Sequence, residues 1–360
     1  MGAVESRVGS VLHWLLEPKE APAWVAGSGG RTTFPPAPPG SLLLLGHVGF
    51  AVPDVEAARR FCVECLGGQE QPRKETQAQK EVRIGAASSP TATSTRSTCS
   101  SSVAPRRWTS PAGASEIRLL PAADAAAAAW PGHLYVWVAD IQRTLEGCRA
   151  LEKQLGVELV QEVHHITSSD AVDALLLRDP CQLNSFVVNQ APKGLAARIR
   201  TIGGASAAPA EGAARPNLLG VIEAVHTVPA GVAVSLARFY SHFLSAAVTQ
   251  KQGGWAVHFS LGKALRQTLL FAEAEEAAPE PQAAELPEVC VYLPSAEDFE
   301  AAFQRCSEAG LLQGTWEKAQ KTCEFRFQRC QDPETGSAAL ELKHVVRSPE
   351  HPDCPRCPGE

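Results

Sequence analysis

Hydrophobic and polar residues follow the same order in four stretches of the chain. In each stretch, apolar residues first alternate with others and then recur at helical spacing, which predicts a strand, a turn and an amphipathic helix. The four are GHVGFAVPDVEAARRFCVECLGG (46–68), HLYVWVADIQRTLEGCRALEKQLG (133–156), EAVHTVPAGVAVSLARFYSHFLSA (223–246) and EVCVYLPSAEDFEAAFQRCSEAG (288–310). The repetition predicts four copies of one structural unit.

The first stretch shows how the pattern specifies the unit. Alternation separates the residues at 47, 49 and 51 from those at 48, 50 and 52, as a half-buried strand requires. Asp54 is a predicted helix N-cap, and apolar residues then recur at helical spacing. The third stretch predicts the clearest helix, with Leu236, Phe239 and Phe243 on one face.

After each helix, shorter apolar segments predict about three further strands. Such a unit exposes a curved half-sheet with a face that it cannot bury alone, so the units are expected to pair. Pairing in chain order predicts two domains, at 41–190 and 217–347, joined by a linker at 191–216. The first domain contains modules 41–121 and 131–190, with a low-complexity insertion at 86–114, and the second contains modules 217–273 and 286–347. Residues 1–40 are expected to form a disordered leader and residues 348–360 a flexible tail.

Composition narrows the class of protein. A chain of 360 residues suffices for two domains, and 44% hydrophobic with 20% charged residues is typical of soluble globular proteins. A net charge of -6 gives no reason to expect nucleic acid as a partner, and no apolar run is long enough to span a membrane. The start of the chain fits the loose N-myristoylation pattern at Gly2. The state of association is expected to be a monomer or a homodimer.

The cysteines indicate a reducing compartment. There are 11, an odd number, and many of them fall inside predicted helices and strands. A free thiol in such a place behaves as a small hydrophobic side chain. A cytoplasmic location is therefore expected rather than a disulfide framework.

A polar residue that can bind a metal opens each of the four predicted strands. These residues are His47, His133, Glu223 and Glu288, each shortly before a valine. A histidine at a strand end is often satisfied by a backbone carbonyl, and a strand carboxylate is often merely solvated. The recurrence at one offset favours a shared site, and both interpretations stay open.

Three motifs resemble the vicinal oxygen chelate superfamily, which includes glyoxalase I, bleomycin-resistance proteins and extradiol dioxygenases. They are HVGFAVPDVEAARRFCVECLGG, HLYVWVADI and DPETGSAALELKH, and the resemblance extends from Leu42 to Arg347. It implies an α+β fold of two tandem domains, each a pair of βαβββ modules that form a curved cup. It also implies one divalent metal in a cup, with ligands from the first and last strand of each module.

Transferred by position, the resemblance implies one ligand set in the first pair of modules: His47, Glu116 and His133. The fourth place falls near Phe186, where no glutamate stands. Two imidazoles and one carboxylate leave positions open for substrate on iron, manganese or zinc. The missing ligand fits either an open site or one that has lost its metal.

The second pair would contribute Glu223, Gln267, Glu288 and Glu341. This set of oxygen ligands suits magnesium or manganese better than zinc. The metal itself stays undetermined among Fe, Mn, Zn, Ni and Mg.

Two functions follow from the resemblance. The first is a metal-dependent lyase, isomerase or dioxygenase acting on a small oxygenated metabolite, with Glu116 or Glu341 as the catalytic base. The alternative is a protein of the bleomycin-resistance type that binds and sequesters a small molecule without turnover. A shared fold does not decide between them.

Overall fold

A computed structural model describes most of the chain from residue 38 onward. The described residues are 38–70, 106–109, 115–122, 129–165, 172–192, 194, 196, 199, 216–261, 265–274, 286–312 and 314–354. Residues 1–37 of the predicted leader at 1–40, most of the predicted insertion at 86–114 and residues 355–360 lie outside this description.

The first two predicted units are both present. The first consists of β1 (Leu44–Val52), α2 (Val55–Arg60) with its π-helical continuation η1 (Phe61–Cys65), β2 (Gln69–Glu70), β3 (Arg106–Thr109) and β4 (Glu116–Pro121). The second consists of β5 (Gly132–Val138), α4 (Ile141–Leu155), β6 (Val160–His164), β7 (Ala174–Arg178) and β8 (Ser185–Gln190). Strand β3 falls inside the stretch expected to be a low-complexity insertion.

The other two units complete the set. The third consists of β9 (Leu218–Pro229), α6 (Val232–Leu244), β10 (Val248–Lys251), β11 (Gly254–Leu261) and β12 (Leu265–Ala274). The fourth consists of β13 (Glu288–Tyr292), α7 (Ala296–Glu308), α8 (Trp316–Thr322), β14 (Glu324–Gln331) and β15 (Ala338–Arg347). The predicted α+β class is confirmed. In the fourth unit, helix α8 stands where the other units have a strand.

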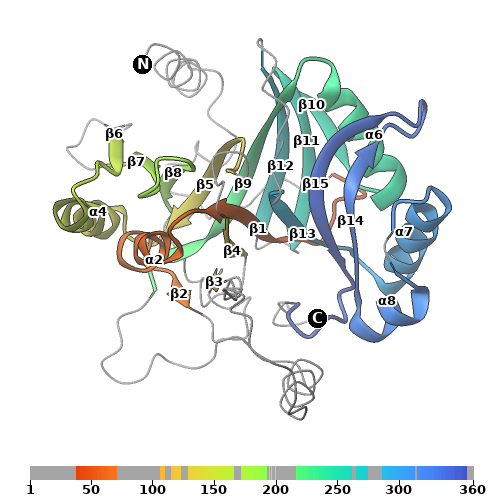
Figure 1. Cartoon of the computed structure of the whole chain (residues 1–360), viewed down its shortest axis with the longest axis horizontal. Coiled ribbons are helices and arrows are strands. Elements are labelled where there is room, and N and C mark those ends of the chain that lie inside the picture. The colour runs from red at the N-terminus through yellow and green to blue at the C-terminus, as the bar shows by residue number, and fades with distance from the viewer. Residues whose placement is uncertain are drawn as a thin grey trace, which may run out of the picture. The chain divides into compact units, whose positions relative to one another are not determined.

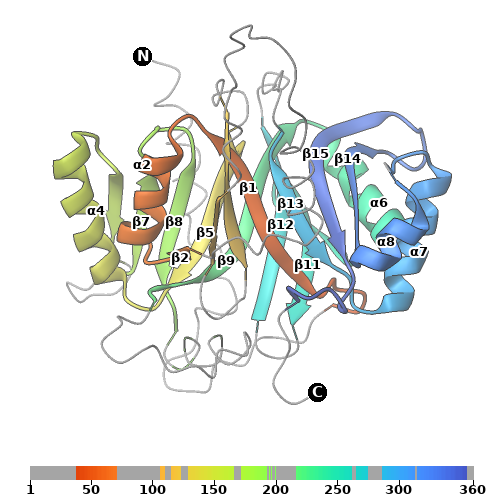
Figure 2. The same ribbon diagram turned by 60° about the horizontal axis from the view of Figure 1, so that its bottom comes forward.

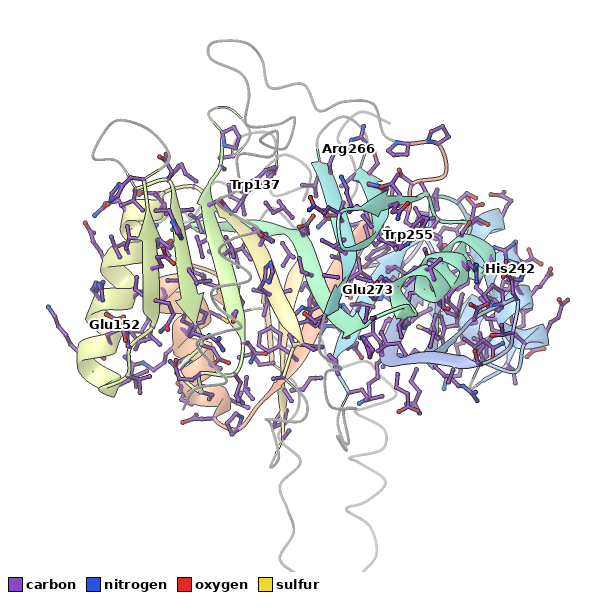
Figure 3. The ribbon with its side chains drawn as sticks, turned by 90° about the horizontal axis from the view of Figure 1, so that it is seen from above. Trp137, Glu152, His242, Trp255, Arg266 and Glu273 are labelled. Carbon is purple, nitrogen blue, oxygen red and sulfur yellow. The ribbon has the colours of Figure 1, made fainter. Side chains whose placement is uncertain are left out.

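Local chemistry explains where the helices begin. The carboxylate of Asp54 accepts hydrogen bonds from two backbone amides of α2, and the Ser295 hydroxyl accepts one at the start of α7. Helix α6 has no such side chain of its own. Instead Glu273 of β12, labelled in Figure 3, accepts from the amides of Gly231 and Ala233 at 2.9 and 3.2 Å. A neighbouring strand thus supplies the cap.

The units combine into two mixed sheets. One has seven strands in the order β14-β15-β13-β1-β4-β3-β2, and the other has eight in the order β10-β11-β12-β9-β5-β8-β7-β6. The joins are antiparallel, β1 with β13 and β5 with β9. The first unit therefore shares a sheet with the fourth, and the second with the third. This differs from the expected pairing in chain order. Each unit presents an equivalent first-strand edge, so apolar patterning alone does not choose the partner.

The hydrophobic core lies on the helix-bearing faces of both sheets. Helix α6 packs on β11 and β12 of one sheet and on β14 and β15 of the other, while α4 packs on η1. Figure 2 shows α2 and α4 on one side and α6, α7 and α8 on the other. We call the opposite face of each sheet, turned away from the helices, its helix-free face. The polar residues that open the strands lie on these helix-free faces.

Candidate functional site

Three predicted site residues lie together on the helix-free face of the seven-stranded sheet. His47 of β1 is in register with Glu116 of the neighbouring strand β4, and its imidazole Nε2 is 2.7 Å from Oε1 of Glu288 on β13. Alternation sends Val48 and Phe50 into the core, so His47 faces the other way. First and last strands of two units thus meet at one place, and Figure 1 shows β4, β1 and β13 next to one another.

Arg118 occupies the centre of this group. Its Nη1 donates to Oε1 of Glu288 at 3.1 Å, and its Nε donates to Oε2 of Glu116 at 3.3 Å. Glu288 Oε1 therefore accepts from both Arg118 and His47. Arg118 is only 5% exposed. A permanent cation of the protein itself lies between the two carboxylates.

The ionisation states follow from burial and from this cation. Burial, followed by the charge of Arg118, holds the pKa of His47 well below its ordinary value, so the ring is neutral. Burial by itself would raise the pKa of Glu288. The hydrogen bond from His47 and the nearby positive charge outweigh burial, and the pKa is lowered. The centre thus holds a neutral imidazole donating to a carboxylate whose pKa is kept low by that hydrogen bond and by the charge of Arg118.

These residues do not fit a divalent metal. In the first unit, Glu116 on the last strand is the register partner of His47 on the first strand. In the fourth unit, the corresponding partner of Glu288 is Lys343, a second cation in addition to Arg118. Glu341, predicted as a ligand and base, is two residues away, exposed and in register with Arg329. Across the described parts of the chain, no group of three or more His, Cys, Asp and Glu residues is arranged to hold a metal. The fixed positive charges of Arg118 and Lys343 stand where a metal ion would bind, and they oppose its binding.

A second layer of charges borders this centre on the same face. Arg347 donates to Oε2 of Glu324 at 2.8 Å and to the hydroxyl of Tyr292 at 2.9 Å. His351, beyond the last strand, contacts Glu324 at 3.8 Å and lies edge-on to Tyr292. The segment after β15 is therefore folded back here as far as residue 354, although the sequence predicted a flexible tail.

The eight-stranded sheet brings together the other pair of strand-opening residues. His133 of β5 and Glu223 of β9 lie on adjacent strands, with Tyr135 as the register partner of Glu223. The rings of His133 and Tyr135 are 4.9 Å apart in edge-to-face contact. The hydroxyl of Thr268 donates to Oε2 of Glu223 at 2.5 Å. One imidazole and one carboxylate are too few ligands for a typical metal site.

Two polar atoms of this second group are buried without a partner. Within the described structure and its contacts, neither Nε2 of His133 nor the hydroxyl of Tyr135 makes a hydrogen bond. Burial lowers the pKa of His133 to about 4, so its ring is neutral. Burial also raises the pKa of Glu223, against the hydrogen bond from Thr268. Such orphaned groups are unusual in protein interiors, where most buried polar atoms are paired.

Gln267, the remaining predicted ligand, points away from Glu223. Its side-chain oxygen accepts from the backbone amide of Leu45 at 3.0 Å, and its nitrogen donates to the carbonyl of Val221 at 2.7 Å. Residues 45 and 221 belong to different sheets, so the amide joins the two. Thr268 is the register partner of Glu223. Chain order alone did not distinguish position 267 from 268.

Sequence reasoning missed Arg118 and Lys343, although both carry a signal in the alternation. Arg118 lies two residues after Glu116 on one strand and therefore shares its face. Lys343 has the same relation to Glu341. A search for metal ligands considers only residues able to bind a cation, and so it passes over the cations beside them.

Comparisons with known proteins find distant structural likenesses. No protein-family model and no curated protein matches the chain. A candidate dioxygenase from Bacillus subtilis is 11% identical with a TM-score of 0.49, covering 86% of each chain. Glyoxalase I from Zea mays is 10% identical with a TM-score of 0.46, covering 85% of this chain and 92% of that one. The cppA protein from Streptococcus pneumoniae is 8% identical with a TM-score of 0.42, covering 86% and 99%.

Within the described ranges, no helix is both long enough and apolar enough to cross a bilayer.

Proposed function

We propose that this protein binds a small molecule without a metal, in the manner of the sequestering alternative that the sequence left open. The observation that carries the proposal is the position of Arg118, whose guanidinium lies between Glu116 and Glu288 at 3.3 and 3.1 Å. Its positive charge offsets part of the negative charge that a metal would otherwise need to offset. The two carboxylates predicted as metal ligands on this face, Glu116 and Glu288, therefore already have a cationic partner within the protein.

The metal-dependent enzyme is the weaker candidate. It needs an open coordination position on an ion held by three or four side chains. Lys343 stands at the fourth ligand place of the seven-stranded sheet, and Glu341, the proposed base, is exposed two residues earlier on the same strand. No catalytic step is therefore assigned to a metal.

Features of the eight-stranded sheet also favour ligand binding. His133 and Tyr135 place aromatic rings next to polar atoms that lack partners among the described residues. Aromatic walls with a few polar groups are typical of small-molecule sites. Trp137, two residues further along β5 and labelled in Figure 3, adds a third ring to this face.

Binding without metal is tested on the full chain after dialysis against a chelator. Thermal unfolding is recorded with a panel of small oxygenated metabolites, in parallel with and without added Zn²⁺, Mn²⁺, Ni²⁺ and Mg²⁺. We expect stabilisation by at least one compound in the metal-free protein, unchanged by the ions. Stabilisation or turnover that requires an ion overturns the proposal.

A further inference from the structure

We infer that a groove between α7 and α8, in the fourth unit, binds a linear aliphatic diamine in its doubly protonated form. This groove is separate from the helix-free faces of the sheets, so the inference goes beyond the proposed function and does not depend on it. Three observations carry it: a hollow with an aromatic wall, two carboxylates without partners along one helix, and a lining whose charged residues are all acidic.

The groove exists because the fourth unit departs from the other three. Helix α8 stands where they have a strand, and Figure 1 shows it beside α7 at the outer edge of this unit. The two helices leave a hollow of about 300 Å³ between them. Its lining comes from these helices alone and consists of Glu300, Phe303, Gln304, Ser307, Glu308 and Trp316.

Two aromatic side chains form one wall of the groove. The ring of Phe303 lies 5.0 Å from that of Trp316, with the two planes inclined by 57°. Phe303 is 7% exposed, whereas Trp316 is half-buried and keeps part of its surface open. Aromatic rings bury aliphatic chains and also attract ammonium groups to their faces, tryptophan most strongly. The wall therefore suits an alkyl chain that carries positive charge.

Two carboxylates of α7 lie along the groove. Glu300 and Glu308 are eight residues apart, which corresponds to a rise of about 12 Å on one side of the helix. Both are exposed, and among the described residues neither carboxylate has an ion pair or a hydrogen bond. Glu308 ends α7, where the helix dipole opposes a negative charge. Two carboxylates at this separation match two ammonium groups on one extended chain.

The basic residues of the two helices do not neutralise this pair. Arg305 donates to the carbonyl of Phe243 and to the hydroxyl of Ser245, both at 3.0 Å, and these groups belong to neither helix. Lys318 and Lys321 are exposed and do not line the groove. Over both helices the acidic residues outnumber the basic ones: Glu297, Asp298, Glu300, Glu308 and Glu317 against Arg305, Lys318 and Lys321. The groove thus favours a cation when every charge is counted.

The test is isothermal titration of the full chain at low ionic strength with three compounds of equal chain length. They are 1,8-diaminooctane, octylamine, which has one ammonium group, and 1,8-octanediol, which has none. We expect the diamine to bind with a dissociation constant near or below about 1 mM. Octylamine should bind at least about threefold more weakly, because one carboxylate then stays without a partner. The diol should bind at least about tenfold more weakly than the diamine.

Variants locate the binding. Glu300→Gln combined with Glu308→Gln should weaken diamine binding by about fivefold or more, since two ion pairs are lost. The matched control is Glu146→Gln combined with Glu158→Gln. It removes the same charge at two exposed positions in the second unit and should change the affinity by less than about 1.5-fold. Trp316→Leu should weaken binding by about threefold through the loss of its ring.

Three results would overturn the inference. They are no measurable binding of the diamine, equal binding of the diamine and the diol, and equal affinities of the groove variant and the control variant with unchanged circular dichroism. Equal binding of octylamine and the diamine would also contradict it, because only one carboxylate would then be engaged. None of these results bears on metal-free binding at the helix-free faces, so the two proposals fail separately.

Discussion

Arg118 and Glu288 are 170 positions apart in the chain, and Nη1 of one donates to Oε1 of the other at 3.1 Å. The contact passes over Gly49 of β1, which joins the first unit to the fourth. It places a permanent positive charge where the resemblance to vicinal oxygen chelate proteins implied a metal. The contact lies where β1 and β13 join the first and fourth units in one sheet.

Removing the guanidinium should destabilise the fold. Arg118→Met leaves Glu116 and Glu288, whose side chains are 15% and 12% exposed, without their cation. We expect a loss of about 2 to 4 kcal/mol in the free energy of unfolding, somewhat below the cost of orphaning a fully buried charge. Urea denaturation measures it.

The control for this experiment is Arg59→Met. Arg59 pairs with Glu56 on the surface of α2, and Glu56 is 57% exposed. Exposed pairs of this kind contribute little, so the change should stay below about 0.5 kcal/mol. Equal losses in the two variants would show that Arg118 contributes no more than a surface ion pair.

Stability should fall on mild acidification. Burial lowers the pKa of His133, His226 and His344 to about 4, against an ordinary value of 6.5. Because the folded pKa lies below the unfolded one, this contribution is complete above pH 6.5 and is lost as pH falls towards 4. Each ring should account for up to about 2 kcal/mol of the loss at pH 5. Urea denaturation at pH 7, 6 and 5 measures the decline.

A single substitution tests the source of that decline. His133→Gln removes one buried ring whose pKa is lowered, the one on β5 of the eight-stranded sheet, and the fall between pH 7 and pH 5 should become shallower. A free energy of unfolding that is flat over this range in the unmodified protein would contradict the assignment of neutral buried rings.

Gln267 should act in stability rather than in metal binding. Gln267→Met keeps the approximate volume but removes the hydrogen bonds to Leu45 and Val221 that join the two sheets. Buried backbone groups left unpaired typically cost about 1 to 3 kcal/mol. Gln250→Met, at an exposed position, is the control and should be nearly neutral. Unchanged unfolding of the Gln267 variant would contradict this structural role.

Helix α4 offers a test in which packing opposes helix propensity. An alanine at an exposed helix interior normally stabilises by about 1 kcal/mol relative to glycine. At Gly147 the added Cβ would meet the backbone oxygen of Glu64. We therefore expect Gly147→Ala to destabilise, by about 1 to 3 kcal/mol. Thermal unfolding of this variant beside Ala150→Gly, at an exposed position of the same helix, measures the sign; a stabilised Gly147→Ala would contradict the close approach of α4 and η1.

The sequence predicts local structure well because each unit carries its own signals. Asp54 caps its helix as expected, and the apolar residues of 232–244 form one buried helix face. The partnership of units was not predictable in the same way, since it depends on which first-strand edges meet. The pairing of β1 with β13 joins residues 239 to 248 positions apart, from Gly49 with Glu288 to Leu44 with Tyr292, and no local motif encodes it.

The site was predicted in part for the same reason. His47, Glu116 and Glu288 do meet, but His47 and His133, which chain order grouped together, lie in different sheets. Arg118 was missed because its role depends on Glu288, which only the fold brings within reach. A motif search for ligands does not reveal that a cation already lies among them.

The most direct test of this account is the metal content of the purified full chain and of Arg118→Ala, each incubated with Zn²⁺ or Mn²⁺ and then desalted. We predict less than about 0.1 ion per chain in the unmodified protein. In Arg118→Ala, where His47, Glu116 and Glu288 lose their internal cation, the content should rise towards about one ion per chain, and it should fall again in Arg118→Ala with His47→Ala. About one ion bound per unmodified chain, lost in the His47→Ala variant, would contradict the central claim that Arg118 takes the place of the metal.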